Sequence, residues 1–387
     1  MSTLNSRPAG EQEFKDFNFE KNIAHVKNSA LSVFNPETIR QLRQTTFLQE
    51  QTGTLTPETL AFIYQQKLFK LFIPEELGGL KLDLLEALKT FEQASFIDGS
   101  FGWAVTIGAG GGFFTEFLPA KTAKKLFSPQ NAVVAGSGHP TGTAIKTAGG
   151  YQVSGQWKYC SGANYATIFT ASCIVKEPTK PDYIKAFTFL PEQVQIVQDW
   201  NTFGLKATGS HSIKVENAFV PEDYTFDLSL PVSGAAPLIY QYPFLQFAQA
   251  SFATVSLGIC RHFLEAVESM IAEKKVSWEK SDPKRYAFMA KKSAAAQSML
   301  QETASEFYNI IEKSWETLTQ KQEITEGLLQ QITWQCRKSV RVAVQAAQSL
   351  FPYLGLEAAK ESSIINQTYR DLHTACQHTL LLDFDEN

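Results

Sequence analysis

The sequence has few of the residues that build disulfide frameworks and metal centres. It contains 5 cysteines and 6 histidines among 387 residues, and the cysteines are far apart, with no C-x-x-C pair. Neither a zinc site nor a disulfide framework is therefore predicted. The one close pair of histidines, His373 and His378, is separated by a five-residue step. Because such a step turns about 140° around a helix, the two rings do not share a face as a metal-binding pair does, and we expect no metal site.

Charge and long apolar runs are also scarce. Charged residues make up 19% of the sequence and the net charge is -4, against a usual charged fraction of about 25%. The 35 basic residues are spread along the chain, which excludes the basic footprint of a nucleic-acid-binding protein. No run of 18 apolar residues occurs, so no membrane span is predicted. Residues 1–21 are polar and mixed in charge, unlike a secretory signal, and we expect a cytoplasmic protein.

The common nucleotide and hydrolase motifs are missing. The glycines at 108–112 lie in helical surroundings and Phe113 occupies the last glycine position of a G-x-G-x-x-G motif, which excludes a Rossmann site. No G-x-x-x-x-G-K-[ST] motif occurs. Asp98 stands where the G-x-S-x-G motif of serine hydrolases has its first glycine. Nucleoside triphosphate and serine hydrolase chemistry are therefore not expected.

Length and hydrophobic pattern predict an α+β protein that is mainly helical, in three parts. At about 150 residues per domain, the chain is long enough for two or three domains. Residues 1–130 are predicted to form a helical N-terminal domain, in which Thr56 caps a helix that begins at Pro57 and ends before Pro74. Residues 131–231 are predicted to form a small antiparallel β-barrel or sandwich, with strands at 131–134, 143–147, 151–159, 167–175, 185–190 and 212–219. Residues 232–387 are predicted to form a C-terminal four-helix bundle, with helices at 245–275, 285–318, 324–350 and 366–382.

Four short motifs occur in order across this plan. They are residues 74–79 (PEELGG), 136–140 (GSGHP), 155–163 (GQWKYCSGA) and 204–210 (GLKATGS). Together they resemble the acyl-CoA dehydrogenase superfamily, and the resemblance covers about residues 60–378. It implies a flavin bound where a helical domain, a β-domain and a four-helix bundle meet, and a homotetramer.

The resemblance also implies which residues meet the flavin. Tyr159 and Ser161 are predicted to alternate along one strand and to share a face, although Tyr159 and Trp200 would be read as core residues without the family pattern. By the same resemblance, Trp200, Phe203 and the turn at 208–210 are expected to close a flat slot around the ring from a neighbouring strand. The complete set of expected cofactor-binding residues is Tyr159, Cys160, Ser161, Trp200, Phe203, Thr208, Gly209, Ser210, Lys274 and Arg370.

The chain lacks the base of an acyl-CoA dehydrogenase. The usual glutamate position aligns with Thr379, and the alternative position, near 247–251, has no acidic residue. Without a general base, desaturation of a thioester has no evident mechanism. The string from Arg370 to His378 instead resembles the flavin-dependent two-component monooxygenases of the same superfamily. There, residues matching His378 and Ser161 face the reactive edge of a flavin C4a-hydroperoxide, which implies that these two are catalytic.

The leading hypothesis is thus a monooxygenase that hydroxylates a small apolar or aromatic substrate. An acyl-CoA dehydrogenase is the alternative, and a catalytically silent flavin-fold binding protein is the second. For His378, a simple hydrogen bond at a helix end also remains open. Lys274 stands near the family arginine that reaches the flavin diphosphate, and lysine keeps the charge without the fork. Two alternatives therefore stay open for the cofactor: permanently bound FAD, and reduced FMN or FAD exchanged with a separate flavin reductase.

Phenylalanine is abundant, at 29 residues. The resemblance places several of these rings beside the substrate side of the flavin, which predicts a pocket that excludes water. Ser137, His139 and His211 lie in segments that approach the same side, although each is also explained as a loop hydrogen-bonding residue. The predicted substrate-pocket residues are Phe101, Trp103, Ser137, His139, His211 and Phe247.

Overall fold

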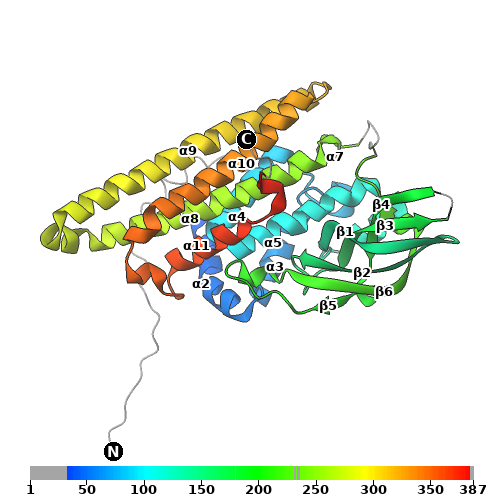
Figure 1. Ribbon diagram of the computed structural model, residues 1–387, viewed down its shortest axis with the longest axis horizontal. Helices are drawn as coiled ribbons and strands as arrows, with labels where there is room; N and C mark the ends of the chain where they lie inside the picture. The colour runs from blue at the N-terminus through cyan, green and yellow to red at the C-terminus, as the bar shows by residue number, and fades with distance from the viewer. Residues whose placement is uncertain (1–32, 179, 231, 233–235, 384–387) are drawn as a thin grey trace, which may run out of the picture.

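The computed structural model describes residues 33–178, 180–230, 232 and 236–383. The polar stretch at 1–21 and the domain boundary predicted at residue 231 lie outside these residues. Within them, the predicted order of helices, strands and helices is confirmed (Figure 1). No helix in the described ranges is both long and apolar enough to cross a bilayer. The same ranges contain no group of three or more His, Cys, Asp or Glu side chains that could ligate a metal.

Short polar side chains start the N-terminal helices. Asn35, Thr56, Asp83 and Asp98 each accept a hydrogen bond from the backbone of the first turn that follows, which satisfies an otherwise unpaired N–H group. The predicted cap at Thr56 is confirmed, but the helix ends well before Pro74, because Lys67 adopts a left-handed φ of 56°. The elements of this part are α2 (Pro36–Thr52), α3 (Pro57–Gln65), α4 (Leu84–Ile97), α5 (Gly99–Gly110), η3 (Gly111–Phe117) and α6 (Ala120–Phe127).

The strands of the described residues form one sheet in the order β5-β6-β2-β1-β3-β4-β7. Their bounds are β1 (Val134–Thr147), β2 (Gly150–Cys160), β3 (Ile168–Glu177), β4 (Lys180–Phe189), β5 (Gln195–Val197), β6 (His211–Pro221) and β7 (Thr225–Phe226). The strands predicted at 131–134 and 143–147 correspond to a single long strand, β1. It begins at Val134, the last residue of the first predicted strand, and ends at Thr147, the last residue of the second. The prediction of a purely antiparallel domain is wrong in one pair, because β3 follows β2 but pairs in parallel with β1.

The sheet curls around its own core. Trp157 on β2 lies with its ring centroid 5.9 Å from that of Phe189 on β4, and Tyr151 lies 5.1 Å from Phe187. Two strands lie between β2 and β4 in the sheet, so these contacts close across its interior. This core is the interior of the predicted barrel or sandwich.

Long helices form the C-terminal part. They are α8 (Phe244–Ser281), α9 (Pro283–Thr319), α10 (Glu326–Leu350) and α11 (Ile364–Ala375), and α8 packs against the other three and against α4. The predicted helix at 366–382 is too long. It ends at Ala375, and His378 takes an extended conformation that caps the short turn η9 (Thr379–Leu381).

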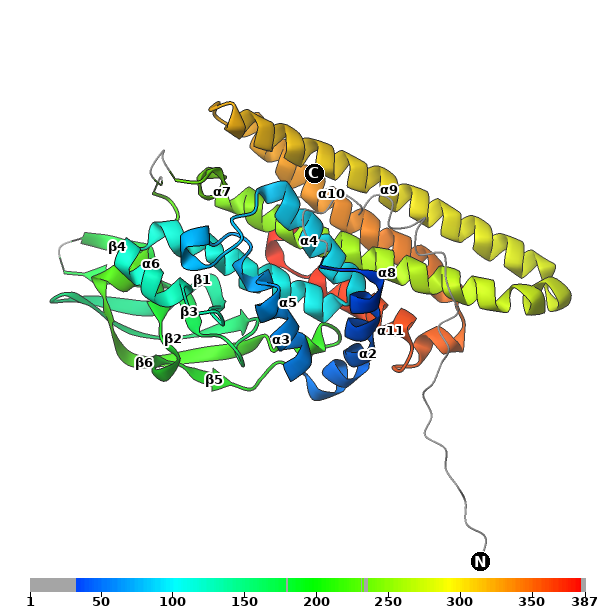
Figure 2. The same ribbon diagram turned by 180° about the vertical axis from the view of Figure 1, so that it is seen from behind.

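The three parts meet around α5. Figures 1 and 2 show the sheet at one end of the molecule, the long helices extending away from it, and α4 and α5 between them. α5 contacts β1, α8, α11 and the turn η5 (Lys206–Thr208). Residues on these elements can therefore combine in one site.

Candidate active site

A chain of hydroxyl groups lies where β2, α5 and η5 meet. The Ser161 Oγ is 2.9 Å from the Trp103 Nε1 and 2.7 Å from the Ser210 Oγ. The Ser210 Oγ is in turn 2.7 Å from the Thr208 Oγ1, which donates to the Leu205 carbonyl at 2.8 Å. The intervening Gly209 has a φ of 54°, a left-handed turn that glycine adopts without steric cost. Ser161, Thr208 and Ser210 are all buried.

The direction of every hydrogen bond in this chain follows from the number of protons. Each hydroxyl has one proton. Thr208 gives its proton to the Leu205 carbonyl, so Ser210 must donate to Thr208 and Ser161 must donate to Ser210. The indole N–H of Trp103 can only donate, and it donates to Ser161. In this pattern Ser161 uses its proton within the row of hydroxyl groups, and its Oγ can act toward a further partner only as an acceptor.

His378 lies against the same indole. Its ring centroid is 4.2 Å from that of Phe252 and 6.2 Å from that of Trp103, and Phe252 stacks on Trp103 at 5.3 Å. The His378 Nδ1 accepts a hydrogen bond from the Leu380 N–H at 3.3 Å, so the proton of the neutral ring is on Nε2. Burial lowers the pKa of His378 to about 4, because the charged imidazolium loses hydration. At neutral pH the ring is an uncharged N–H donor.

The alternative prediction for His378 was a simple hydrogen bond at a helix end, and the bond from the Leu380 N–H is of this kind. The same ring also packs against Trp103. Gln249 on α8 was not recognised in the sequence. It is buried, and its Nε2 donates to the Leu380 carbonyl at 2.9 Å, which fixes the turn that carries the histidine. A buried glutamine in the apolar stretch at 247–252 is the signal that could have found it.

The aromatic residues predicted to face the flavin lie at the surface beside this row of hydroxyl groups. Tyr159 is 70% exposed and Phe203 is 57% exposed, while the half-buried Trp200 lies edge-on to Tyr159 at 6.3 Å. The prediction that Tyr159 and Ser161 share a face of one strand is wrong. The ladder between β2 and β6 is irregular after Trp157 and Tyr159 has a φ of 65°, so Tyr159 turns outward while Ser161, just past the strand, turns inward.

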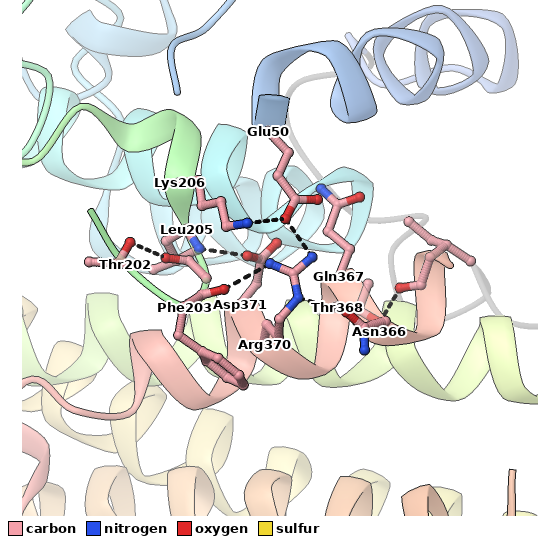
Figure 3. A network of polar contacts seen from close by, with 12 residues as sticks. Glu50, Thr202, Phe203, Leu205, Lys206, Asn366, Gln367, Thr368, Arg370 and Asp371 are labelled. Atoms are coloured by element: carbon pink, nitrogen blue, oxygen red, sulfur yellow. Dashed lines mark hydrogen bonds and ion pairs between the residues drawn. The ribbon is translucent and has the colours of Figure 1, made fainter. Parts of the chain in front are cut away.

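Arg370 faces the interior of the protein. Its guanidinium forms an ion pair with Glu50 on α2, donates to the Phe203 carbonyl at 2.8 Å and donates to the Asn366 Oδ1 at 2.7 Å (Figure 3). The arginine therefore holds the loop of Phe203 against α2 and α11. Among the described residues, the positive charge of Arg370 is paired with the carboxylate of Glu50. The sequence analysis did not predict this ion pair.

Two predicted pocket phenylalanines belong to neighbouring aromatic clusters. Phe101 is two residues before Trp103, a turn of about 200° on a helix, and it packs against Phe34 and Phe62 at centroid distances of 6.2 and 6.5 Å. Phe247 packs against Phe113 at 4.7 Å. Both are buried core residues.

The predicted histidines other than His378 lie in loops and strands of the β-domain. The His211 Nδ1 accepts a hydrogen bond from the backbone N–H of Trp200 at 3.0 Å. Burial lowers the pKa of His211, so the neutral imidazole holds the loop that carries Trp200. His139 is exposed in the irregular part of β1, and its N–H lies 3.5 Å from the Ser137 Oγ. Cys160 points into the core of the sheet, where burial raises its pKa to about 12.

Lys274 lies far along α8 from the cluster. It is half-buried, and 22 residues of helix separate it from Phe252, about 33 Å at 1.5 Å per residue. Within one chain it does not join the site residues.

Trp103 gives a first prediction, because its two contacts can be separated. Trp103→Phe keeps an aromatic ring against Phe252 and removes the donor to Ser161, so we expect a loss of about 1 kcal/mol in the free energy of unfolding, the value of one hydrogen bond. Trp103→Ala also removes the buried ring and should cost about 3–5 kcal/mol. Urea unfolding measures both, with Trp334→Phe at an exposed position as the control. Equal losses for the two Trp103 variants would contradict the assignment of the hydrogen bond.

Comparisons with known proteins show which class of protein this chain is similar to. A model of the family "Acyl-CoA dehydrogenase, C-terminal domain" matches residues 250–382. The indole-3-acetate monooxygenase of Pseudomonas putida is 27% identical over 321 residues, which are 81% of this chain and 81% of the relative. The oxygenase subunit HsaA of a flavin-dependent monooxygenase from Rhodococcus jostii is 20% identical over 88% of this chain and 91% of its own length.

Solved structures agree in fold. The 3-HSA hydroxylase from Rhodococcus sp. RHA1 has a TM-score of 0.82 and 20% identity, covering 89% of this chain and 91% of its own. XiaF from Streptomyces sp., solved in complex with FADH2 and glycerol, has a TM-score of 0.80 and 18% identity, covering 94% of this chain and 92% of its own.

These findings confirm the predicted class: the chain is a flavin-dependent oxidoreductase with the acyl-CoA dehydrogenase fold. Within that class, both relatives named above are monooxygenases, and the one from Rhodococcus jostii is a subunit of a flavin-dependent monooxygenase. The predicted resemblance to the monooxygenase branch is thereby confirmed.

Proposed function

We propose that this protein is the oxygenase component of a two-component monooxygenase, which hydroxylates a small aromatic substrate with reduced flavin from a separate reductase. The observation that carries the proposal is the pairing of a lone-pair acceptor at Ser161 with a neutral N–H donor at His378. Both groups contact Trp103, one by a hydrogen bond and the other by ring packing. Such a pair binds and orients neutral ligands and does not abstract carbon-bound protons.

A dehydrogenase reaction has no base among these residues. Thr379 and the stretch 247–251 carry no carboxylate, and Asp383, the next carboxylate in the chain, pairs with Arg337 at 3.2 Å. The His378 Nδ1 is already occupied by the Leu380 N–H. The low pKa of the ring also makes it a weak base.

The residues present fit a flavin. Tyr159, Trp200 and Phe203 offer an exposed aromatic surface beside buried hydroxyl groups, which matches a flat ring with polar edges. When bound, a reduced flavin supplies the electrons that activate oxygen. Reduced flavin carries a proton on N5 and oxidised flavin carries a lone pair there, so an acceptor at Ser161 would favour the reduced form with N5 turned toward this residue, as the resemblance implies.

The substrate class follows from the surroundings of His378. Phe252 and Trp103 are flat, apolar neighbours of its ring, and the N–H donor suits a phenol oxygen or another acceptor on an aromatic ring. The names of the relatives include an indole-acetate monooxygenase, which supports an indole or phenol substrate. We also propose a homotetramer, in which Lys274 of a second copy completes the flavin phosphate site.

We expect reduced FMN or FAD to bind at least about fivefold more tightly than the oxidised form, since one mismatched hydrogen bond costs about 1–3 kcal/mol. Anaerobic titration of the protein with each form measures the two dissociation constants. With a flavin reductase and NADH in air, indole and phenol compounds should stimulate product formation. Bleaching of bound flavin by an acyl-CoA without oxygen, together with no aromatic product, would overturn the proposal.

A further inference from the structure

Three carboxyl groups from distant parts of the chain meet beneath the candidate site. Glu50 comes from α2, Asp98 precedes α5, and Asp371 lies on α11. Asp98 and Asp371 are 4% and 3% exposed. Their packing is tight, because a Cβ atom at Gly99 would lie only 2.8 Å from the Asp371 Oδ2. The glycine next to Asp98 thus lets Asp371 approach it.

Each aspartate holds an element that carries a site residue. The Asp98 Oδ1 accepts from the Phe101 N–H at 2.8 Å and starts α5, the helix of Trp103. The Asp371 Oδ1 accepts from the Leu205 N–H at 2.6 Å, at the start of the segment that leads to Thr208 and Ser210 (Figure 3). α11 itself leads to His378.

A further bond joins the two aspartates' helices. The Gln367 Nε2 on α11 donates to the Asp98 Oδ2 at 3.3 Å. Trp103, the hydroxyl chain and His378 are therefore held relative to one another through this pair of carboxyl groups.

The cluster has more acidic groups than cations. Arg370 and Lys206 pair with Glu50, and Arg43, which also faces Asp98, pairs with Glu265 at 2.8 Å. Together these are four carboxyl groups, Glu50, Asp98, Asp371 and Glu265, and three cations, Arg43, Lys206 and Arg370.

Two carboxyl oxygens in the cluster, the Asp371 Oδ2 and the Glu50 Oε2, are buried without a hydrogen bond. Burying an unpaired negative charge is costly, and one proton would balance the count. In agreement, burial and the neighbouring carboxylates raise the pKa of Asp98 to about 6 and that of Asp371 well above its ordinary range.

We propose that the Asp98–Asp371 pair holds one proton at neutral pH and that Asp371 is a positioning residue, which keeps α5, the 201–210 segment and α11 aligned for the site. The pair touches neither substrate nor flavin and acts through Trp103, Ser161 and His378. Only the flavin-binding part of the test below rests on the proposed function.

The proton has a definite effect on stability. A carboxyl group whose pKa is higher in the folded than in the unfolded protein binds the proton more tightly when folded. The stability that it contributes is present at low pH and is lost as the pH rises through the folded pKa. An asparagine side chain cannot ionise, and its amide resembles a protonated carboxyl group in shape and in its capacity to donate a hydrogen bond.

Asp371→Asn is therefore expected to gain stability relative to the wild type as the pH rises from 5 to 9. The difference in Tm between the two proteins should increase by at least about 2 °C over this range. Asp83→Asn is the matched control, because the Asp83 side chain, like that of Asp371, accepts a backbone N–H but lies outside this cluster, and its Tm difference should not increase. The infrared difference spectrum of wild type minus Asp371→Asn at pH 7 should contain the carbonyl stretch of a protonated carboxylic acid.

Asp98→Asn, which keeps a capping oxygen for α5, provides the same two readings if Asp371→Asn folds poorly. Absence of the carboxylic acid band, together with no increase of the Tm difference in either variant, would overturn the shared proton. For the positioning role, Asp371→Ala leaves the Leu205 N–H unpaired and should weaken reduced-flavin binding about tenfold, while Asp371→Asn restores it. Equal binding of reduced flavin by the Ala and Asn variants would overturn the positioning role. Absence of flavin binding by the wild type would contradict the proposed function. The infrared and Tm measurements would then still show whether the Asp98–Asp371 pair holds a proton.

Discussion

His378→Ala should lower the rate of substrate hydroxylation about 10²–10³-fold, the range seen when one oriented donor is removed from an active site. The ring is held by Phe252 on one side and by the Leu380 N–H at Nδ1, so its Nε2–H is the donor that the variant loses. Oxygen consumption should continue with release of hydrogen peroxide in place of product. The measurement is product formed per oxygen consumed, with reduced flavin at saturation.

The controls for this prediction come from the chain itself. His373→Ala removes a histidine whose Nδ1 lies 2.8 Å from the Tyr369 carbonyl on the outer side of α11, and it should keep the wild-type ratio. His378→Gln restores an N–H donor and should recover part of the activity. Because the pKa of His378 is about 4, wild-type activity should show no step from this ring between pH 6 and 8 and should fall only as the pH approaches 4. A step near pH 6.5 that disappears in His378→Gln would contradict the neutral donor.

Arg370→Ala should reduce the free energy of unfolding by about 3–5 kcal/mol, the usual effect of removing one partner of a buried ion pair, because only Lys206 then remains to pair with Glu50. The side chains of Arg370 and Glu50 are 8% and 10% exposed, and the arginine also bonds the Phe203 carbonyl and Asn366. Denaturant unfolding measures the loss. Arg40→Ala, which breaks an exposed pair with Glu37, should change stability by less than about 1 kcal/mol.

A second substitution identifies the cause. Glu50→Gln in the Arg370→Ala background removes the buried carboxylate that has lost one of its two cations, so it should recover part of the lost stability. If Arg370→Ala were no more destabilising than Arg40→Ala, the buried pair would not be a structural support of the Phe203 loop.

Much of the site could be predicted from the sequence because its polar residues lie inside short motifs. Ser161, Thr208 and Ser210 come from two of the four motifs, and the structure brings them together with Trp103 within hydrogen-bonding distance. His378 was found through the string that begins at Arg370. The order of helices and strands was predicted separately, from the hydrophobic periodicity of the sequence.

The remaining features depend on backbone detail and on contacts between distant segments. The outward turn of Tyr159 needs a φ of 65°, which alternation along a strand does not reveal. Whether Ser161 acts as donor or acceptor depends on the hydrogen bond that the Thr208 hydroxyl donates to the Leu205 carbonyl. Glu50 and Arg370 form an ion pair although they lie far apart in the sequence. No local sequence pattern shows that a glutamate near the end of an amphipathic helix is buried.

The wide sequence separation of the site contacts has a consequence for folding kinetics. Trp103 and Ser161 are 58 residues apart, Leu205 and Asp371 are 166 apart, and Asp98 and Gln367 are 269 apart. The entropy cost of closing a loop grows with its length, and contacts of long range form slowly. A ligand that binds only the completed arrangement stabilises the native state alone. Recovery of flavin affinity during refolding should therefore lag behind the return of helical signal, and it marks the moment when the last long loop closes.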